Sequence, residues 1–435
     1  MRAVSLSFAI LCVLPALTAG PVWGAPAFQD QNGPGAGQPM TADNLASWVL
    51  EANPGLAAIE AAAEAAAYRI EPAGSFDDPM LSYGVAPLTA GANRSLNQNV
   101  DISQKIPWHG TLAARESAAR YEAVAAGRDV DSLRLQVIAQ AKSAYAEWRF
   151  VDSALVIHHA TQALLDELIA TAETRYAAGR ALKQDVLQAE VERTDLDNRL
   201  LRLLRQQATV QARINALLNR APDAPLPAAA PISLQSTPPA LEALQPLALA
   251  QHPELSRLDA EISASESRVT LAEKAFFPDF QVGVGYGGFW DETDKRPVFA
   301  VSINVPFDRS KRRSELDRAR AETRRTKFSL SERRAELLAA LTTARAEVIE
   351  AQGSVALYQD ELVPLAEEYL EAAIADYQSG AGAFLNVITA EQRKLDTELE
   401  LARARANYVR RLAELELWVG GSLNEFLPTA AGAKQ

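Results

Sequence analysis

One short stretch in the second half of the chain decides the fold, and it reads Phe280-Gln-Val-Gly-Val-Gly-Tyr286. Large apolar residues alternate in it with glutamine and glycine, which is the period of a β-strand with two unlike faces. We predict that the apolar side chains face lipid and that the glycines face a lumen, where small residues leave room for passage. The predicted lipid-facing residues are Phe280, Val282, Val284 and Tyr286.

Three further segments share this alternation. Strands are predicted at residues 279–288 and 297–307 in the second half of the chain, and at about 79–88 and 96–107 in the first half. Each has about ten residues, the length of a tilted strand that crosses a bilayer. A closed membrane barrel needs at least about eight strands, and an open sheet edge is not tolerated in lipid. One chain supplies four, so several chains must share a barrel.

The four strands belong to an internal duplication. Ile106-Pro-Trp108 recurs as Val305-Pro-Phe307, and Tyr176-Ala-Ala-Gly179 recurs as Tyr377-Gln-Ser-Gly380, in the same order and at nearly the same offset. A proline-rich linker separates the two copies and cannot be helical throughout. The predicted domains are a first repeat at 41–221, the linker at 222–239, a second repeat at 240–423 and a C-terminal tail at 424–435.

A long helical hairpin follows each strand pair. Between Thr111 and Ala178 only Gly127 interrupts the helical pattern, and a continuous helix of that length measures about 100 Å. We predict hairpins at 109–221 and 309–419, whose apolar stripes pack as coiled coils. Their tips lie near Gly179 and Gly380, and Pro364 is predicted to kink the second hairpin. The fold class is therefore mainly α, with a duplicated strand-strand-hairpin unit.

Composition and motifs narrow the function. The 435 residues carry a net charge of −12, which argues against a nucleic-acid partner. Cys12 is the only cysteine, and four histidines and three methionines leave little material for a soft-metal site. The segment Gly283–Gly288 fits a dinucleotide-binding pattern, but a loop and another strand follow it instead of a helix. We therefore expect neither an enzyme nor a cofactor.

The N-terminus predicts export. Residues 1–24 have a positive start, an apolar stretch and small residues near the predicted cleavage site, as in a secretory signal peptide. Two functions then remain open: an outer-membrane duct, and a soluble periplasmic coiled-coil protein of structural or adaptor type. The strands favour the duct, because a soluble protein gains nothing by exposing Phe280, Val282 and Val284. A basic run at 309–313 is either a solvated helix start or a contact with lipid headgroups or the lumen.

The stretch Asp101-Ile-Ser-Gln-Lys-Ile-Pro-Trp-His-Gly110, together with the doubled hairpin tips, resembles the TolC-type outer-membrane efflux channels. The resemblance runs from about Asn44 to Leu423. It implies a homotrimer with a shared twelve-stranded barrel in the outer-membrane lipid and a helical barrel in the periplasm. It also implies two partners, a periplasmic adaptor protein and an inner-membrane pump of the resistance-nodulation-division type. Within this stretch, the sequence Ser103-Gln-Lys-Ile-Pro-Trp108 is similar to that of the heavy-metal branch of the family. This similarity suggests heavy-metal cations as substrates.

The same resemblance implies that the hairpin tips form the periplasmic gate. Asp185 and Tyr377 match the family's latch partners, so a hydrogen bond between them is expected. If this bond does not set the constriction, Phe384 or Leu385 is expected to do so as an apolar plug. The family's acidic entrance positions fall on Asn386 and Thr389, so a charged ring is not expected there. The implied gate residues are Tyr176, Gly179, Asp185, Tyr377, Gly380, Phe384 and Asn386.

Overall fold

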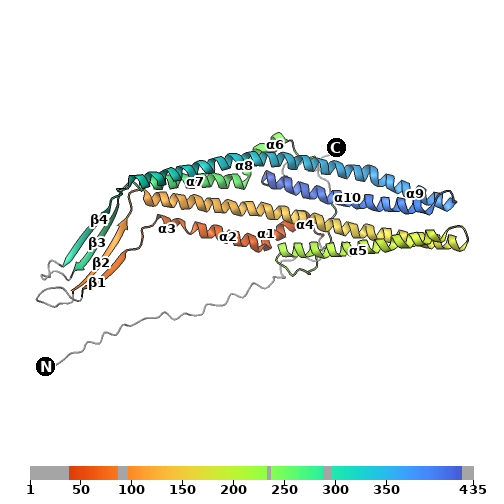
Figure 1. Cartoon of the computed structure of the whole chain (residues 1–435), viewed down its shortest axis with the longest axis horizontal. Helices are drawn as coiled ribbons and strands as arrows, with labels where there is room; N and C mark the ends of the chain where they lie inside the picture. Colours follow the sequence, from red (N-terminus) through yellow and green to blue (C-terminus); the bar gives the residue numbers. More distant parts are fainter. Residues whose placement is uncertain (1–38, 87–96, 233–236, 288–295, 424–435) are drawn as a thin grey trace, which may run out of the picture.

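A computed structural model describes residues 39–86, 97–232, 237–287 and 296–423. The molecule is long and narrow, with a sheet at one end and two helical tips at the other (Figure 1). The predicted signal peptide and C-terminal tail lie outside the described residues. No helix in the described ranges is both long and apolar enough to cross a membrane.

The first repeat begins with short helices that the sequence did not fully predict. The alanine-rich pattern from Leu56 to about Ile70 indicates one helix, but three occur before the first strand. Thr41 caps the first of them through a bond from the Asn44 amide at 3.1 Å, and Asn53 caps the second through the Leu56 amide at 3.2 Å. The elements of this repeat are α1 (Ala42–Ala52), α2 (Pro54–Ala67), α3 (Ile70–Gly74), β1 (Met80–Ala86), β2 (Asn97–Ile106), α4 (Thr111–Ala177) and α5 (Lys183–Leu217).

The second repeat follows the same order of helices, two strands and a long hairpin. Pro253 opens its second helix as Pro54 does in the first repeat, at the position where a missing amide N–H costs nothing. Its elements are α6 (Leu241–Gln251), α7 (Pro253–Lys274), β3 (Asp279–Gly287), β4 (Pro297–Asn304), α8 (Arg309–Leu357), η3 (Tyr358–Leu362), α9 (Val363–Ser379) and α10 (Phe384–Val419).

The irregularity predicted at Pro364 occurs one turn earlier. The five residues of η3 form a turn of π-helix between α8 and α9. Proline has no N–H and its ring crowds the carbonyl four residues before it, so the regular ladder cannot pass through this point. The wider π-turn accommodates the proline, and the helix continues as α9.

The two repeats meet in one antiparallel sheet of order β1-β2-β3-β4. The central pair, β2 and β3, joins the repeats, and its register places Ile102 opposite Val284. On either side, Leu81 lies opposite Ile102 and Phe299 opposite Val284. Paired residues share a face, so the alternation predicted in each strand is in phase across all four.

A polar clasp holds the repeats together halfway along the rod. The Lys142 ammonium of α4 lies 2.7 Å from the Glu416 carboxylate of α10 and 2.8 Å from that of Asp43 in α1. Burial alone would lower the pKa of Lys142, but the two carboxylates outweigh it and raise that pKa. Between the clasp and the hairpin tips, α4, α5, α9 and α10 share an apolar core, and we call this part of the molecule the tip bundle.

Candidate functional site: sheet faces, mid-helix groove and hairpin tips

One face of the sheet is apolar and largely open in the single chain. Val282, Val284 and Tyr286 are exposed on β3, and Phe299 of β4 is 80% exposed. Phe280 is half-buried because its ring stacks on Trp108, with 6.0 Å between ring centroids. A folded chain does not leave such a face in water without a partner or a membrane to cover it. Its large members are Leu81, Tyr83, Val85, Val100, Ile102, Val282, Val284, Tyr286, Phe299, Val301 and Ile303.

The opposite face is polar and lined by small residues. Gln281 donates from Nε2 to the Ser103 Oγ at 2.9 Å across the β2–β3 pair. A Cβ added to Gly285 would lie 3.1 Å from the Val100 carbonyl oxygen and from the Asp101 Cβ. Glycine at this position therefore allows the strands to pack closely without a shift of the neighbouring atoms, and it adds no side chain to this face. The groove on this side is lined by Asn99, Asp101, Ser103, Gln281, Gly283, Gly285, Gly287, Ala300 and Ser302.

An aromatic joint fixes the sheet to the helices. The Trp108 ring stacks on Phe277 with 4.9 Å between centroids, and its backbone N–H donates to the Asp279 carboxylate at 3.2 Å. Lys105 pairs with the same carboxylate at 3.4 Å. Gly110 then takes a left-handed conformation, with φ of 81°, just before α4. The motif that carried the family resemblance thus builds this joint between the repeats, and sequence reasoning missed its partner Phe277.

The basic run at the start of α8 is partly neutralised by its own helix. Asp308 caps α8 by accepting from the Lys311 amide at 2.9 Å. Arg312 forms an ion pair with Glu315 at 3.0 Å. These contacts are those of an ordinary solvated helix start.

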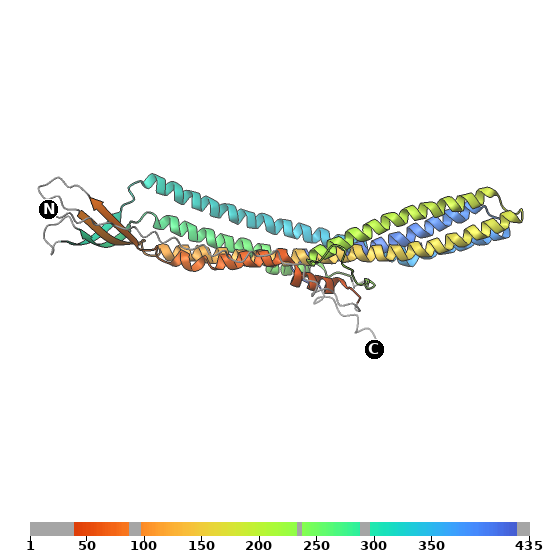
Figure 2. The same cartoon turned by 90° about the horizontal axis from the view of Figure 1, so that it is seen from below.

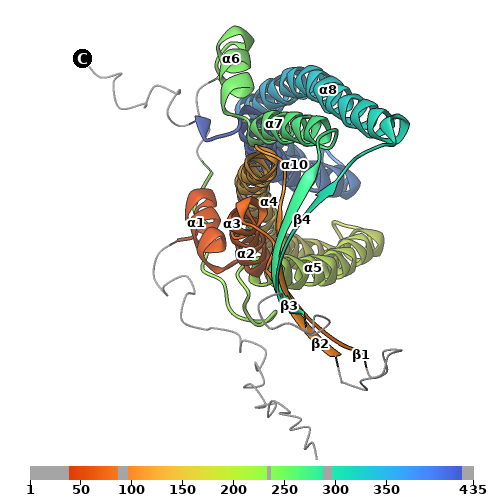
Figure 3. The same cartoon turned by 90° about the vertical axis from the view of Figure 1, so that its left-hand side faces the viewer.

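A groove halfway along the rod lies on the face opposite α1. On α4, Ala141 and Tyr145 pack into the core formed with α1, whereas Ser143, Glu147 and Phe150 line the groove. Successive helical residues turn by about 100°, which places these two sets on opposite sides of α4. Viewed from the sheet end, α1 and α6 lie away from the side on which α5 and α8 project (Figure 3). We call this feature the mid-helix groove.

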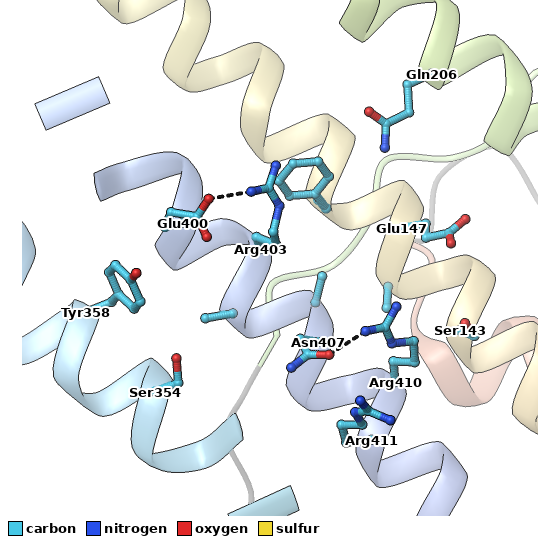
Figure 4. Close-up of a pocket in the computed structure, with 14 residues that line it drawn as sticks. Ser143, Glu147, Gln206, Ser354, Tyr358, Glu400, Arg403, Asn407, Arg410 and Arg411 are labelled. Atoms are coloured by element: carbon cyan, nitrogen blue, oxygen red, sulfur yellow. Dashed lines mark hydrogen bonds and ion pairs between the residues drawn. The ribbon is translucent and has the colours of Figure 1, made fainter. Parts of the chain in front are cut away.

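Arginines of α10 dominate the mid-helix groove. Figure 4 shows Arg403 and Arg410 reaching towards α4. Arg403 pairs with Glu400, and its guanidinium lies 5.4 Å from the Phe150 ring centroid. Arg410 donates to the Asn407 side chain at 2.6 Å and has no carboxylate partner within the described residues. Sequence analysis did not identify this groove, although the helical spacing of 400, 403, 407 and 410 along one face was a usable signal.

The hairpin tips bring several predicted gate residues together. Gly179 and Gly380 turn the chain in the left-handed region, with φ of 69° and 83°, as predicted for tight tips. The rings of Tyr377 and Phe384 meet edge to face, with 5.1 Å between centroids. Arg175 lies over the Tyr377 ring at 4.6 Å and donates to the Gln378 carbonyl at 2.9 Å, which links the two hairpins. Tyr176 and Asn386 are exposed.

One expectation about the gate was wrong for the single chain. The Asp185–Tyr377 hydrogen bond does not form, since the Tyr377 hydroxyl is buried without a partner in the described part of the chain. Phe384 and Arg175 hold the tyrosine ring inside the tip bundle; burial and then the Asp185 charge raise the pKa of the phenol. Phe384 is only 2% exposed and lies in the same core, so of the two expected entrance residues only Leu385 is exposed.

This architecture, four strands with one open apolar face on a long double hairpin, defines a class of outer-membrane channel subunits. Residues 244–421 match the family model described as outer membrane efflux protein. Over these residues the chain is similar to that family, whose channels are of the TolC type. The outer membrane is its location, with the helices in the periplasm.

Individual relatives agree with this assignment. Two efflux pump outer membrane proteins of Pseudomonas putida, the probable SepC and the toluene pump component TtgF, are each 25% identical over 351 residues, covering 76% of this chain and 70% of theirs. The solved structure of the outer-membrane channel OprN matches with a TM-score of 0.77 at 18% identity, over 88% of this chain and 90% of that one. VceC of Vibrio cholerae matches with a TM-score of 0.75 at 20% identity, over 88% and 96%.

Proposed function

We propose that three copies of this outer-membrane efflux channel close one twelve-stranded barrel and act as the passive exit duct of a tripartite pump. The observation that carries the proposal is the sheet itself. Among the described residues of the single chain, β1 and β4 are unpaired at their outer edges, and one face is apolar and exposed. Pairing β4 of one copy with β1 of the next removes every edge, which lipid requires.

The long helices support the same ring. On α5, Val191 and Leu201 are 62% and 67% exposed, and on the α8–α9 edge Leu357 and Leu365 are 47% and 59% exposed. Near the exposed residues of α5 the sequence has arginines at 199, 202 and 205. Near those of the α8–α9 edge it has acidic residues at 360, 361 and 368. Two unlike and complementary edges form a head-to-tail contact, which generates a closed ring.

The ring would place the mid-helix groove on the wall of the duct. The groove lies opposite α1, so the short helices cover the outside of the tube and the groove faces its interior. The polar, glycine-lined face of the sheet continues this inner surface into the barrel. Substrate then meets Arg403, Arg410 and Glu147 along the helical part, and Asn99, Asp101 and Gln281 in the barrel.

The partners follow from the passive role. A duct needs an inner-membrane transporter as its source of energy, here one of the resistance-nodulation-division type, and a periplasmic adaptor protein to reach it. The sequence of residues 103–108 suggests heavy-metal cations as substrates. The relatives named for toluene and solvent pumps instead favour small organic molecules. The structural match to CusC, at 16% identity, supports the fold alone.

Disulfide trapping between copies tests the ring. Leu201 and Leu357 lie at nearly the same height, since 22 and 23 residues separate them from Gly179 and Gly380. Cys12 lies within the predicted signal peptide, so Leu201→Cys with Leu357→Cys adds the only cysteine pair to the exported protein. We expect oxidation to give a covalent trimer in detergent.

The matched control pairs Val191→Cys with Leu357→Cys. The two positions differ in height by about 16 Å at 1.5 Å per residue, so no covalent trimer is expected. A monodisperse monomer that stays soluble without detergent, with neither pair cross-linking, would overturn the duct and favour the soluble periplasmic coiled-coil alternative.

A further inference from the structure

The tip bundle contains a buried carboxyl group that no contact neutralises. Glu391 of α10 is 2% exposed, and in the described part of the chain neither of its oxygens has a hydrogen-bond partner. Its neighbours in sequence, Ile388, Ala390 and Leu395, belong to the apolar core of the bundle. An ionised carboxylate in such a place is costly, so the group favours its protonated form.

A second acid, on the other hairpin, lies close enough to act on Glu391 through its charge. Glu192 of α5 is 7% exposed, and one of its oxygens accepts from the Gln392 amide at 2.5 Å. Burial first, and then the charge of Glu192, raises the pKa of Glu391 to about 7. The two repeats therefore each contribute one carboxyl group to the same core.

The remaining charges around Glu391 are few. Arg199 on α5 and Lys394 on α10 favour its ionised form, and Asp396 on α10 opposes it. The charges that act most strongly on this carboxyl group come from α5 and α10, whereas α4 and α9 contribute Leu165, Leu168, Leu370 and Ala373 to the surrounding core. Arg199 and Lys394 offset only part of the effect of burial and of Glu192 on the Glu391 carboxyl group. How well the bundle packs therefore depends on whether Glu391 is protonated.

We propose that Glu391 and Glu192 form a proton-operated latch that keeps the tip bundle packed while Glu391 is protonated and loosens it when the proton leaves. The latch rests on the tip being the periplasmic entrance of the proposed duct. A neutral Glu391 fits the apolar core because it places no charge there. Two ionised groups in the same core repel each other and require water, which enters only if the helices separate.

Linkage fixes the direction of the response. In an open, hydrated tip the pKa of Glu391 returns towards the ordinary glutamate value, whereas in the packed tip it is about 7. The packed tip therefore binds the proton more tightly. Its advantage is full below the ordinary pKa and declines as the pH rises through the range from about 4.5 to about 7.

Hydrogen–deuterium exchange on the detergent-solubilised trimer tests the latch without requiring transport. After correction for intrinsic exchange, protection of residues 384–395 should fall about tenfold between about pH 6 and pH 8, the change expected when one group titrates over this range. Glu391→Gln, a permanently neutral isostere, should keep the protection at both pH values. Glu371→Gln removes an exposed carboxylate of α9 at a similar height, and it should behave like the unchanged protein.

Planar-bilayer recordings connect the latch to the channel. Open probability should rise with periplasmic-side pH in the unchanged protein and in Glu371→Gln, and stay at its low-pH level in Glu391→Gln. Exchange protection that does not depend on pH, in a protein that forms channels, would overturn the latch. A pH-dependent tip in a protein that forms no channels would instead overturn the proposed duct and leave the latch standing.

Discussion

The sheet and the tip bundle lie at opposite ends of the rod (Figure 2), and they bury and expose opposite kinds of side chain. In the sheet the large apolar residues point outward, as Phe299 at 80% exposure illustrates, and the polar and small residues line the inner groove. In the tip bundle the apolar residues face inward, and two buried polar groups, the Tyr377 hydroxyl and the Glu391 carboxyl, have no hydrogen-bond partner within the described chain. The sheet has an apolar face suited to lipid and a polar face suited to water. The tip bundle has an ordinary apolar core that contains a titratable group, Glu391.

The largest expected effect comes from breaking the core of the tip bundle. Leu196 is 1% exposed and packs among α4, α5, α9 and α10. Leu196→Ala should lower the free energy of unfolding of the bundle by about 2–5 kcal/mol, because it removes buried methyl groups and leaves a cavity. Thermal unfolding followed by circular dichroism measures the loss. Leu385→Ala, at an exposed tip position, should cost far less; equal costs would contradict the packing of the bundle.

Reversing the polarity of one sheet face should be nearly as damaging. Val282→Arg places a charge on the apolar face and should cost about 2–4 kcal/mol of membrane insertion near the bilayer midplane. Gln281→Arg, one residue earlier, places the same charge on the polar face, where it should be tolerated. Membrane fractionation and trimer yield distinguish the two variants. Similar losses at both positions would show that the two faces do not differ as lipid and lumen.

The two ends also differ in how far the sequence foretold them. The strands were predictable because alternation is local: each residue of Phe280–Tyr286 keeps its face whatever pairs with it. The tip turns at Gly179 and Gly380 were predictable for the same reason. Residues gathered from four helices were not, since nothing near Glu391 in sequence shows that Glu192 of the other repeat lies beside it. The predicted Asp185–Tyr377 bond was wrong because the ring packing of Phe384 decides where the phenol points.

The buried acid at the tip predicts a stability effect with a definite sign. Because the pKa of Glu391 is raised to about 7, the folded bundle loses stability as the pH rises above the ordinary glutamate value. Glu391→Gln removes this loss and should raise the free energy of unfolding at pH 8 by about 3 kcal/mol, and by little at pH 4. Chemical unfolding at the two pH values measures the difference. A stabilisation that is the same at both would contradict titration of Glu391.

A smaller effect is expected at the second unpartnered group. Removing the hydroxyl with Tyr377→Phe breaks no hydrogen bond and relieves the burial of an unsatisfied donor, so it should be neutral or stabilise the bundle by about 1 kcal/mol. Asp185→Ala should add nothing to it, since the two side chains do not bond. Single-channel conductance of the double variant should therefore equal that of the unchanged protein. A raised conductance would show that a latch between these residues forms in the trimer.

The smallest effect is expected between the two ends, where the mid-helix groove carries Arg410. This guanidinium is exposed and has no carboxylate partner in the described chain, whereas Arg403 is balanced by Glu400. In a trimer, three Arg410 side chains at one height would attract anions to the wall, weakly because salt screens exposed charges over about 10 Å at 0.1 M. Arg410→Gln should shift the reversal potential in a salt gradient by a few millivolts towards cation selectivity, with conductance nearly unchanged. Arg410→Lys keeps the charge and should keep the reversal potential, so a shift in both variants would show that guanidinium geometry, and not charge, sets the preference at this level of the duct.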